Sequence, residues 1–359
     1  FTAWLDSAIP PEYQESYDNS GIQVGDPGSE VHSVLLTLDV NEKVVAEAVS
    51  AGCSIIVSHH PLIFSPLKRI NGRNNTERSV AAAIKAGVAV YSTHTCFDAM
   101  AWGVSHILAG KTGLENIKVL SPAEGKLYKI AVYVPVSHAE KVRNALCGAG
   151  AGNIGKYSSC SFSASGTGTF LPGSEAKPFA GELNTLWSGN EIKIETVVPS
   201  HLLESVVKAM KEAHPYEEVA YDIYRLENTS DFAGTGAIGT LPEAVSGIVL
   251  LERLKKIFDV PFIRYSGDSE KRIRTVAVCG GSGASFIHDA FKAGADAFIT
   301  GDIKYHSFTE APASMLVADI GHYESEKYSL NILYDIINKK FPKFALRFSE
   351  IKTNPINYI

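Results

Sequence analysis

Two adjacent histidines end one of the most apolar stretches of the chain. His59 and His60 follow the run Ile55-Ile56-Val57 and precede Pro61. Such a run is typical of a buried strand, and α/β proteins form their sites where strands of this kind end. Adjacent strand residues point to opposite faces, so both imidazoles serve one centre only if the backbone turns or two neighbouring ions are bound. A turn with one exposed and one hydrogen-bonded histidine is the alternative.

Two further groups of polar side chains add candidate ligands. Asp98 lies shortly after a second predicted strand, 88–92, and His322 and Glu326 follow a predicted strand at 314–320. The last two are spaced i and i+4, so on a helix they share one face, as a pair of metal ligands requires. The alternative is that these two residues only cap a helix.

Together the candidates supply three imidazoles and two carboxylates, from His59, His60, Asp98, His322 and Glu326. This set is sufficient for two divalent ions that share a carboxylate. Imidazole and carboxylate without thiolate suit zinc, and also iron, manganese, cobalt or nickel. Two ions about 3.5–4 Å apart lower the pKa of a bridging water and promote hydrolysis. The pattern therefore indicates a dinuclear hydrolytic centre.

The elements that must position these residues alternate as strands and helices. Apolar runs and helical spacing predict strand, helix and strand at 34–38, 42–51 and 54–57, then a helix at 77–86 and the strand 88–92. The C-terminal part repeats the pattern weakly at 275–279, 284–293, 297–299 and 314–320. Units of this βαβ kind build a parallel sheet. Two such halves can present their strand ends to one shared crevice.

The middle of the chain breaks this rhythm. Strand, helix and strand patterns occur on either side of a section rich in Gly and Ser, 150–178, that is typical of hairpins or loops. A βαβ…βαβ order of this kind is found in ferredoxin-like modules. We therefore predict an α/β fold with parallel βαβ units, in which an α+β domain at 125–230 is inserted between two halves of another domain, 1–124 and 231–359.

Two glycine-containing stretches have two interpretations each. Gly280-Gly281-Ser282-Gly283 lies between a predicted strand and helix, where its amides could bind an anion or simply form a tight turn. The segment 17–25 has the Asp, Asn and Gly density of a turn, and it either leads into a strand or lines a site.

Composition narrows the class of protein. A net charge of −6 without any block rich in Lys and Arg argues against a nucleic-acid partner. No apolar run reaches the length of a membrane span, and the first residues lack a secretory signal pattern. Five scattered cysteines argue against a disulfide framework and a thiolate zinc site. We expect a cytoplasmic protein without membrane contact.

The motifs resemble those of the GTP cyclohydrolase 1 type 2 family, also called Nif-three-like, over essentially the whole chain. Five stretches carry the resemblance, in this order: 18–25, Ser58-His59-His60-Pro61-Leu62-Ile63-Phe64, Ser92-Thr93-His94-Thr95 with Asp98, Thr300-Gly301-Asp302-Ile303-Lys304-Tyr305-His306, and Gly321-His322 with Glu324-Ser325-Glu326. Five motifs in the family's order make an accidental match improbable.

The resemblance implies a site, a substrate and an assembly. It implies two divalent ions held by the five candidate ligands, with Glu326 as the bridge, and GTP or a similar nucleotide as the substrate. His94 or Asp302 would then shuttle protons. The insert would be similar to PII and CutA-like trimerising modules, of which the stretch 213–218 is typical. Longer family members are toroidal hexamers, trimers of dimers, so we expect a homohexamer.

Departures from the family pattern keep other functions open. Cys96-Phe97-Asp98 stands where Asn-Leu-Asp is usual, and the segment 100–106 departs from a usual Gly-Gly-Val-Asn-Asp, so the support of the ligands and the pocket shape can differ. One alternative is a non-catalytic regulatory assembly whose insert binds a small effector or a protein partner. Another is a di-metal phosphoesterase, for which Lys304 and Arg264 are candidate phosphate-binding cations.

Overall fold

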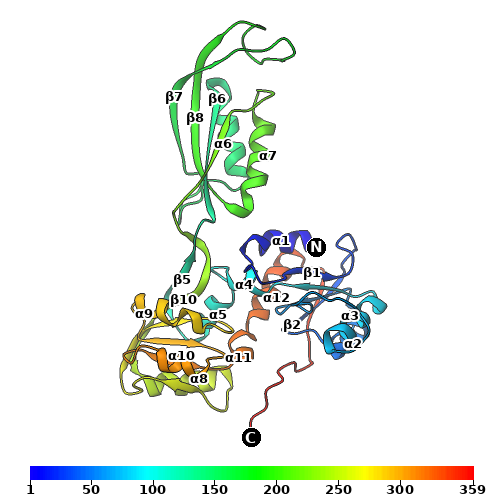
Figure 1. Cartoon of the computed structure of the whole chain (residues 1–359), viewed down its shortest axis with the longest axis vertical. Coiled ribbons are helices and arrows are strands. Elements are labelled where there is room, and N and C mark those ends of the chain that lie inside the picture. Colours follow the sequence, from blue (N-terminus) through cyan, green and yellow to red (C-terminus); the bar gives the residue numbers. More distant parts are fainter. The chain divides into compact units, whose positions relative to one another are not determined.

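The computed structural model describes residues 1–359, apart from the side chain of Asp231. The chain divides into two compact units, whose elements are labelled in Figure 1. Unit 1 comprises Phe1–Pro122 and Phe232–Ile359, and unit 2 comprises Ala123–Asp231. Unit 1 thus contains both ends of the chain. It also contains every candidate ligand predicted from the sequence.

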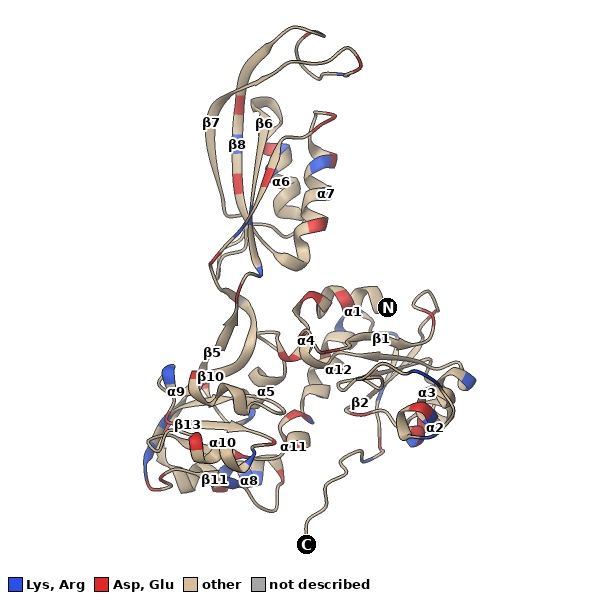
Figure 2. Ribbon diagram, in the orientation of Figure 1, with Lys and Arg blue, Asp and Glu red and all other residues tan. Residues whose placement is uncertain are grey.

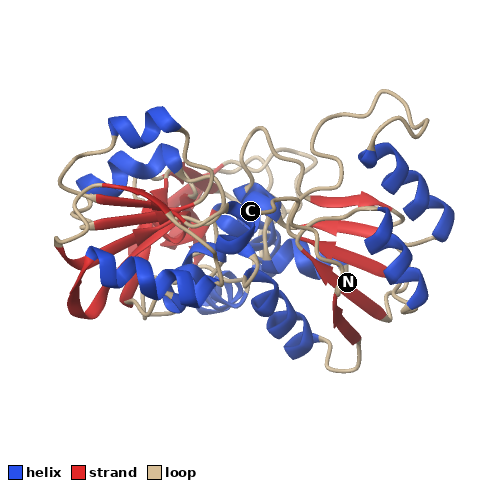
Figure 3. Cartoon of the chain, turned by 90° about the horizontal axis from the view of Figure 1, so that it is seen from below, coloured by secondary structure: helices blue, strands red, loops and turns tan.

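The first sheet of unit 1 is mostly parallel and buried. Its strands, in spatial order, are β1 (Gly21–Val24), β4 (Ala89–Ser92), β3 (Ile55–Ser58), β2 (Ser33–Thr37) and β15 (Ala345–Phe348). Only β1 runs antiparallel to its neighbour. Every residue of β2 and β3 is buried, as expected for parallel strands covered on both faces. Figure 3 shows helices on both sides of the sheets of unit 1.

Side-chain caps define the helices that follow β2 and β3. Asn41 accepts hydrogen bonds from two amides at the start of α2 (Glu42–Ser50). Asn74 does the same for the Glu77 amide at the start of α3 (Asn75–Ala86), which ends at Gly87 in the left-handed conformation. Each cap satisfies backbone donors that a helix terminus leaves unpaired. The predicted βαβ elements are therefore present within a few residues of their expected bounds.

The second sheet of unit 1 is mixed. Its strands, in spatial order, are β11 (Arg264–Ser266), β14 (Leu316–Asp319), β13 (Ala297–Thr300), β12 (Arg272–Val278), β10 (Ser230–Ser246) and β5 (Glu115–Ala123). The three central strands β12, β13 and β14 are parallel, whereas β10 and β11 pair antiparallel with their neighbours. The α/β fold predicted from the sequence is thus confirmed, while the antiparallel strands of this sheet were not predicted.

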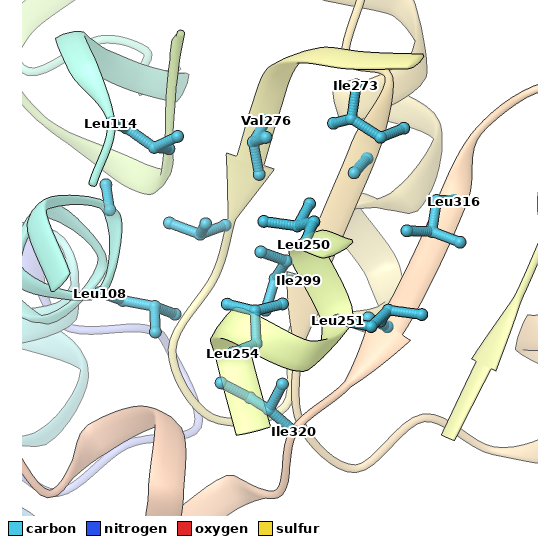
Figure 4. Close-up of a cluster of buried hydrophobic side chains, with 14 of the residues drawn as sticks. Leu108, Leu114, Leu250, Leu251, Leu254, Ile273, Val276, Ile299, Leu316 and Ile320 are labelled. Carbon is cyan, nitrogen blue, oxygen red and sulfur yellow. The ribbon is translucent and has the colours of Figure 1, made fainter. Parts of the chain in front are cut away.

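The core of this second sheet forms under α8 (Gly247–Phe258). Leu250, Leu251 and Leu254 of α8 pack in one buried cluster with Ile299 and Leu316 of the sheet (Figure 4). Burial of each such side chain contributes about 1.5–3 kcal/mol. This packing fixes the strand ends of β13 and β14, from which the C-terminal candidate residues project.

Unit 2 is a four-stranded antiparallel sheet with two helices. In chain order its elements are β6 (Leu127–Pro135), α6 (Ala139–Gly148), β7 (Ser161–Phe170), β8 (Trp187–Pro199), α7 (Leu203–Ala213) and β9 (Tyr221–Arg225). The strands lie in the order β7-β8-β6-β9. The predicted loop or hairpin section contains β7, which pairs with β8 over its whole length. Unit 2 has its own core of residues from both helices and the sheet.

The remaining helices are short or peripheral. They are α1 (Thr2–Ala8), α4 (His94–Asp98), α5 (Val104–Lys111), α9 (Ile287–Lys292), α10 (Tyr305–Glu310), α11 (His322–Glu326) and α12 (Ser329–Lys340), with 3₁₀ turns at Pro11–Tyr13, Val136–His138, Ser200–Leu202 and Ala284–Phe286. Among the described residues, none of the helices combines the length and apolar character needed to cross a membrane.

Candidate metal centre

The backbone turns where the two adjacent histidines follow β3. The amides of His59 and His60 still bond to β2 and its extension, through the Thr37 and Leu38 carbonyls. The carbonyl of His60 then accepts hydrogen bonds from the hydroxyls of Ser58, at 2.8 Å, and Ser92, at 3.2 Å. These bonds stabilise the turn. As a result the two imidazole rings lie on the same side, with their centroids 4.9 Å apart.

The other three candidate ligands come from two short helices. Asp98 ends α4, which follows β4, while His322 and Glu326 begin and end α11, which follows β14. The i and i+4 spacing places His322 and Glu326 on one face of α11, with Nε2 and Oε2 3.2 Å apart. The five candidate ligands therefore lie together, at the ends of strands from both sheets of unit 1.

The five side chains form two groups of ligand atoms that share one carboxylate. Glu326 Oε2 lies 3.0 Å from His60 Nε2 and 3.2 Å from His322 Nε2, and these two nitrogens are 3.2 Å apart. On the other side, His59 Nε2 lies 3.5 Å from Glu326 Oε1 and 3.6 Å from Asp98 Oδ1. Ligand atoms around a tetrahedral ion, with bonds of 2.0–2.2 Å, are about 3.3–3.6 Å apart.

The unpaired buried atoms of the site fit a cation. Both ring nitrogens of His59, Oδ1 of Asp98 and Oε2 of Glu326 are buried without a hydrogen-bond partner among the described residues. Each such atom costs about 1–3 kcal/mol, so folded proteins rarely leave several together. A metal ion would satisfy three of the four. The buried group of His59, His60 and Glu326 could accordingly hold a metal ion.

Two carboxylates lie behind the histidine rings. Asp39 Oδ1 is 2.8 Å from Nδ1 of His60, and Asp302 Oδ2 is 2.7 Å from Nδ1 of His322. A carboxylate at Nδ1 fixes the tautomer and presents Nε2 to the centre. Sequence reasoning missed Asp39, because a single aspartate after a strand carries no distinctive signal. Asp302 contacts His322 directly, whereas its suggested role as a proton shuttle stays a prediction.

The ionisable groups of the site perturb one another strongly. Burial lowers the pKa of His60, but the bond to Asp39 and the adjacent Glu326 carboxylate outweigh this effect and raise the pKa to about 10. His322 responds in the same way to Glu326 and Asp302, with a pKa of about 9. Burial raises the pKa of Asp98. Without metal, protons on imidazole thus balance the buried carboxylate charge, and a cation would replace them.

A second histidine–aspartate pair borders the centre. His94 Nδ1 lies 2.6 Å from Asp18 Oδ1, and the His94 ring is 5.8 Å from that of His59 and 5.7 Å from that of His60. Asp18 also accepts hydrogen bonds from the Thr95 amide, the Thr95 hydroxyl and the Ser20 hydroxyl. Burial raises the pKa of Asp18. The hydrogen bonds with His94, Thr95 and Ser20 have a larger, opposite effect and hold this pKa below its ordinary value. The start of the segment 17–25 therefore borders the site, and its second half forms the strand β1.

A cavity of about 440 Å³ opens on the side of the centre that carries His94. Asp98 and Glu326 reach it from the centre, and Tyr17 and Phe64 lie at its mouth with ring centroids 6.5 Å apart. Both rings are more than half exposed. No lysine or arginine occurs among the described residues that line this cavity.

A second cavity, also of about 440 Å³, is lined by His60 and His322. The candidate cation Arg264 lines it but forms an ion pair with Asp319. Lys304 lines neither cavity among the described residues. The structure therefore brings one of the two candidate phosphate-binding cations near the centre, and a carboxylate already neutralises that one.

The glycine-rich loop after β12 packs against the shared carboxylate. Its Gly281 has φ +64°, and a Cβ atom there would lie 2.3 Å from Glu326 Oε1. The amides of Gly280, Gly281 and Gly283 donate to the hydroxyls of Ser105, Ser325 and Thr300. Because these amides are already engaged, the loop serves as a close support for Glu326, and the tight-turn interpretation of this loop is the one its geometry favours.

Comparisons with known proteins agree over almost the whole chain. The model of the family Duf34/NIF3 (NGG1p interacting factor 3) matches residues 1–355. A GTP cyclohydrolase 1 type 2 homolog of Bacillus subtilis is 39% identical over 357 residues, which cover 98% of this chain and 95% of that protein. A homolog of the same name from Listeria innocua is 38% identical over 365 residues, covering 100% and 98%.

A solved structure is similar over the same extent. The crystal structure of a Bacillus cereus protein related to NIF3 superposes with a TM-score of 0.87 at 38% identity, covering 99% of this chain and 97% of that one. The resemblance inferred from five sequence motifs is thereby confirmed. The chain belongs to the Duf34/NIF3 family.

Proposed function

We propose that this protein is a metal-dependent hydrolase acting on GTP or a related nucleotide, with two divalent ions held by His59, His60, Asp98, His322 and Glu326. The observation that carries the proposal is the pair of ligand groups that meet at the two oxygens of Glu326. Zinc fits the imidazole-rich set, and iron, manganese, cobalt and nickel are its competitors. The name of the curated relatives supplies the substrate class.

Two bound ions would supply a water of lowered pKa and stabilise developing negative charge. The chain itself would contribute orientation and proton transfer. Asp39 and Asp302 hold the rings of His60 and His322 in place. Asp18 would accept a hydrogen bond from His94 Nδ1, which leaves His94 Nε2 as the nitrogen that exchanges a proton with the substrate.

The lining of the cavity beside His94 favours contacts to a base over contacts to phosphates. Tyr17 and Phe64 offer ring faces at the mouth, where a flat heterocycle can stack. Because the described lining contains no lysine or arginine, the phosphates of a nucleotide would extend towards solvent. A guanine base held next to Asp98, Glu326 and His94 would be exposed to hydrolysis.

The test compares the wild type with Glu326→Gln, which removes the charge of the shared carboxylate. We expect about two ions per chain in the wild type, measured by mass spectrometry of metals, and GTP consumption that depends on them. In Glu326→Gln both the metal content and the turnover should fall. Glu324→Gln is the matched control, because Glu324 lies on the same helix and contacts Asn354 instead.

The possible outcomes distinguish a failure of the proposed activity from a failure of the proposed metal site. Two ions without GTP turnover would refute the cyclohydrolase proposal and favour a metal-binding regulatory assembly. Absence of bound ions after metal is supplied would refute the metal centre itself. Turnover of a phosphate ester in place of GTP would support a di-metal phosphoesterase.

We further propose that unit 2 is a ferredoxin-like, PII/CutA-like module through which the chain forms a homohexamer. The β-α-β-β-α-β order and the strand order β7-β8-β6-β9 support the first part. Light scattering of the full chain would test the second. A mass near six chains is expected, and a monomer at micromolar concentration would contradict the proposal.

A further inference from the structure

Unit 2 contains a cavity that plays no part in the metal centre. It has a volume of about 460 Å³ and lies between the end of β7, the segment that follows it, and residues after α7. Four aromatic side chains contribute to its lining, namely Tyr133, Phe170, Phe179 and Tyr216. A volume of this size lies within the range of small-molecule sites.

The aromatic rings around Tyr216 form one connected wall. The Tyr216 ring lies 5.7 Å from Phe170, edge to face, and 6.1 Å from Phe179. Phe170 in turn packs against Trp187, with ring centroids 4.6 Å apart. His214 also holds Tyr216 in place, because the Tyr216 amide donates a hydrogen bond to His214 Nδ1. The wall is therefore held in place by contacts within unit 2.

A buried carboxylate faces this wall. Glu191 of β8 lines the cavity although only 9% of its surface is exposed. The Tyr216 hydroxyl donates to its Oε1 at 2.8 Å, and no hydrogen bond to Oε2 is described. A Cβ atom on Gly168 would lie 2.2 Å from Oε2, so glycine in β7 leaves the room that this oxygen occupies. With Oε1 engaged by Tyr216, Oε2 is the carboxylate oxygen that is left to accept a hydrogen bond from a ligand in the cavity.

The charged side chains that line the cavity all have one sign. Glu217 and Glu218 also line it, and its described lining includes no lysine, arginine or histidine. Figure 2 shows acidic positions on β8. The basic residue of this strand, Lys193, pairs with Glu195 and is not part of the cavity lining. The lining therefore repels phosphate and carboxylate groups and attracts cations.

We propose that this cavity binds a small organic cation through an ammonium or guanidinium group. The cation would lie against the faces of Tyr216 and Phe170, where ring quadrupoles attract positive charge. Glu191 Oε2 would accept its hydrogen bond, which becomes charge-assisted. The same lining excludes nucleoside phosphates as occupants of this cavity. The site is separate from the metal centre, so its occupancy does not depend on the proposed hydrolase activity.

The experiment titrates the full chain with cadaverine, agmatine, pentanediol and ATP. Calorimetry measures binding, and Trp187 beside Phe170 gives a local fluorescence signal once Trp4 and Trp102 are replaced by Phe. We expect cadaverine, agmatine or both to bind, with an affinity that falls as the salt concentration is raised. Pentanediol and ATP should leave the Trp187 signal unchanged. Glu191→Gln keeps an acceptor for Tyr216 but removes the charge, so cation affinity should fall by about tenfold or more.

Glu195→Gln is the matched control, because it removes a carboxylate from the same strand outside the cavity lining. Equal loss of affinity in Glu195→Gln and Glu191→Gln would overturn the proposal, since a general charge effect would then explain binding. Binding of pentanediol as tight as that of the cations would do the same. If neither cation binds and Glu191→Gln instead changes the mass of the assembly, the cavity is an interface with a second copy.

Discussion

Asp39 Oδ1 lies 2.8 Å from Nδ1 of His60, while Nε2 of the same ring lies 3.0 Å from Glu326. One imidazole thus connects two carboxylates, one on each side. A further carboxylate oxygen of Asp39 accepts from the Thr353 hydroxyl, at 2.7 Å. This arrangement sets both the orientation of His60 and the charge that its Nε2 can offer to a metal.

Asp39→Asn should weaken metal binding without removing a direct ligand. Loss of a carboxylate behind a ligating histidine typically costs 10–100-fold in affinity. We expect a loss in this range when metal is titrated against a competing chelator. Asp296→Asn, which changes a carboxylate bonded to backbone amides in β12, is the control and should retain the wild-type affinity. An unchanged affinity in Asp39→Asn would contradict the assigned role.

Asp18→Asn should reduce turnover while leaving the ions in place. The substitution removes the charge that orients His94, and proton transfer by a positioned group is worth about 10²–10⁴-fold. We therefore expect kcat to fall by about a hundredfold with little change in KM, and the pH profile of kcat to shift. Ser20→Ala removes a single bond to the same carboxylate and should have a much smaller effect. Loss of metal in Asp18→Asn would instead assign Asp18 a structural role.

Gly281→Ala should displace the shared carboxylate. Its Cβ atom would lie 2.3 Å from Glu326 Oε1, in addition to the strain of a left-handed alanine. Gly294→Ala is matched to it, because Gly294 has φ +81° but open space around it. We expect both variants to lose about 1 kcal/mol of stability through backbone strain. Only Gly281→Ala should lose bound metal, and retention of both ions would refute the contact with Glu326.

Asp296 should make the stability of unit 1 depend on pH. Burial raises the pKa of Asp296, but bonds from the Thr275 and Arg274 amides and from Lys271 lower it below the ordinary value of 3.8. A group with a lowered folded pKa stabilises the protein above its unfolded pKa and loses that contribution as the pH falls through the folded pKa.

Urea unfolding of the wild type and Asp296→Asn at several pH values tests this dependence. We expect the wild type to be more stable at pH 7 by roughly 1 kcal/mol, since the group is partly exposed. The difference should shrink as the pH is lowered below about 4. A difference that stays constant down to pH 2 would show that the charge of Asp296 is not its cause.

Residue type and strand position were sufficient to predict where the five candidate ligands converge. The apolar run before His59 is typical of a buried strand, and His322 and Glu326 share one face once a helix forms there. Asp39 and Asp18 were not found as partners of the histidines, because a single aspartate in a turn is common. Their roles depend on contacts between segments far apart in the sequence.

The strand β7 was left open between hairpin and loop for a different physical reason. Its sequence, Ser161–Phe170, is rich in Ser, Gly and Thr, and nearly all of its residues are exposed. A strand without a buried face has no alternation of apolar and polar residues to detect. Its pairing with β8 decides its conformation. The glycine loop after β12 was equally undecided, because the sequence does not show that hydroxyls already occupy its amides.

The ligands of the centre are distributed between the two ends of the chain, and the last strand, β15, completes the first sheet beside β2. His59 therefore leaves the ribosome well before Glu326. At about 5–20 residues per second, a gap of about 270 residues corresponds to roughly 10–50 s of synthesis. During that interval the N-terminal half has neither its edge strand nor its bridging carboxylate. A metal ion at this site would therefore meet its complete set of ligands only after Glu326 has been synthesised.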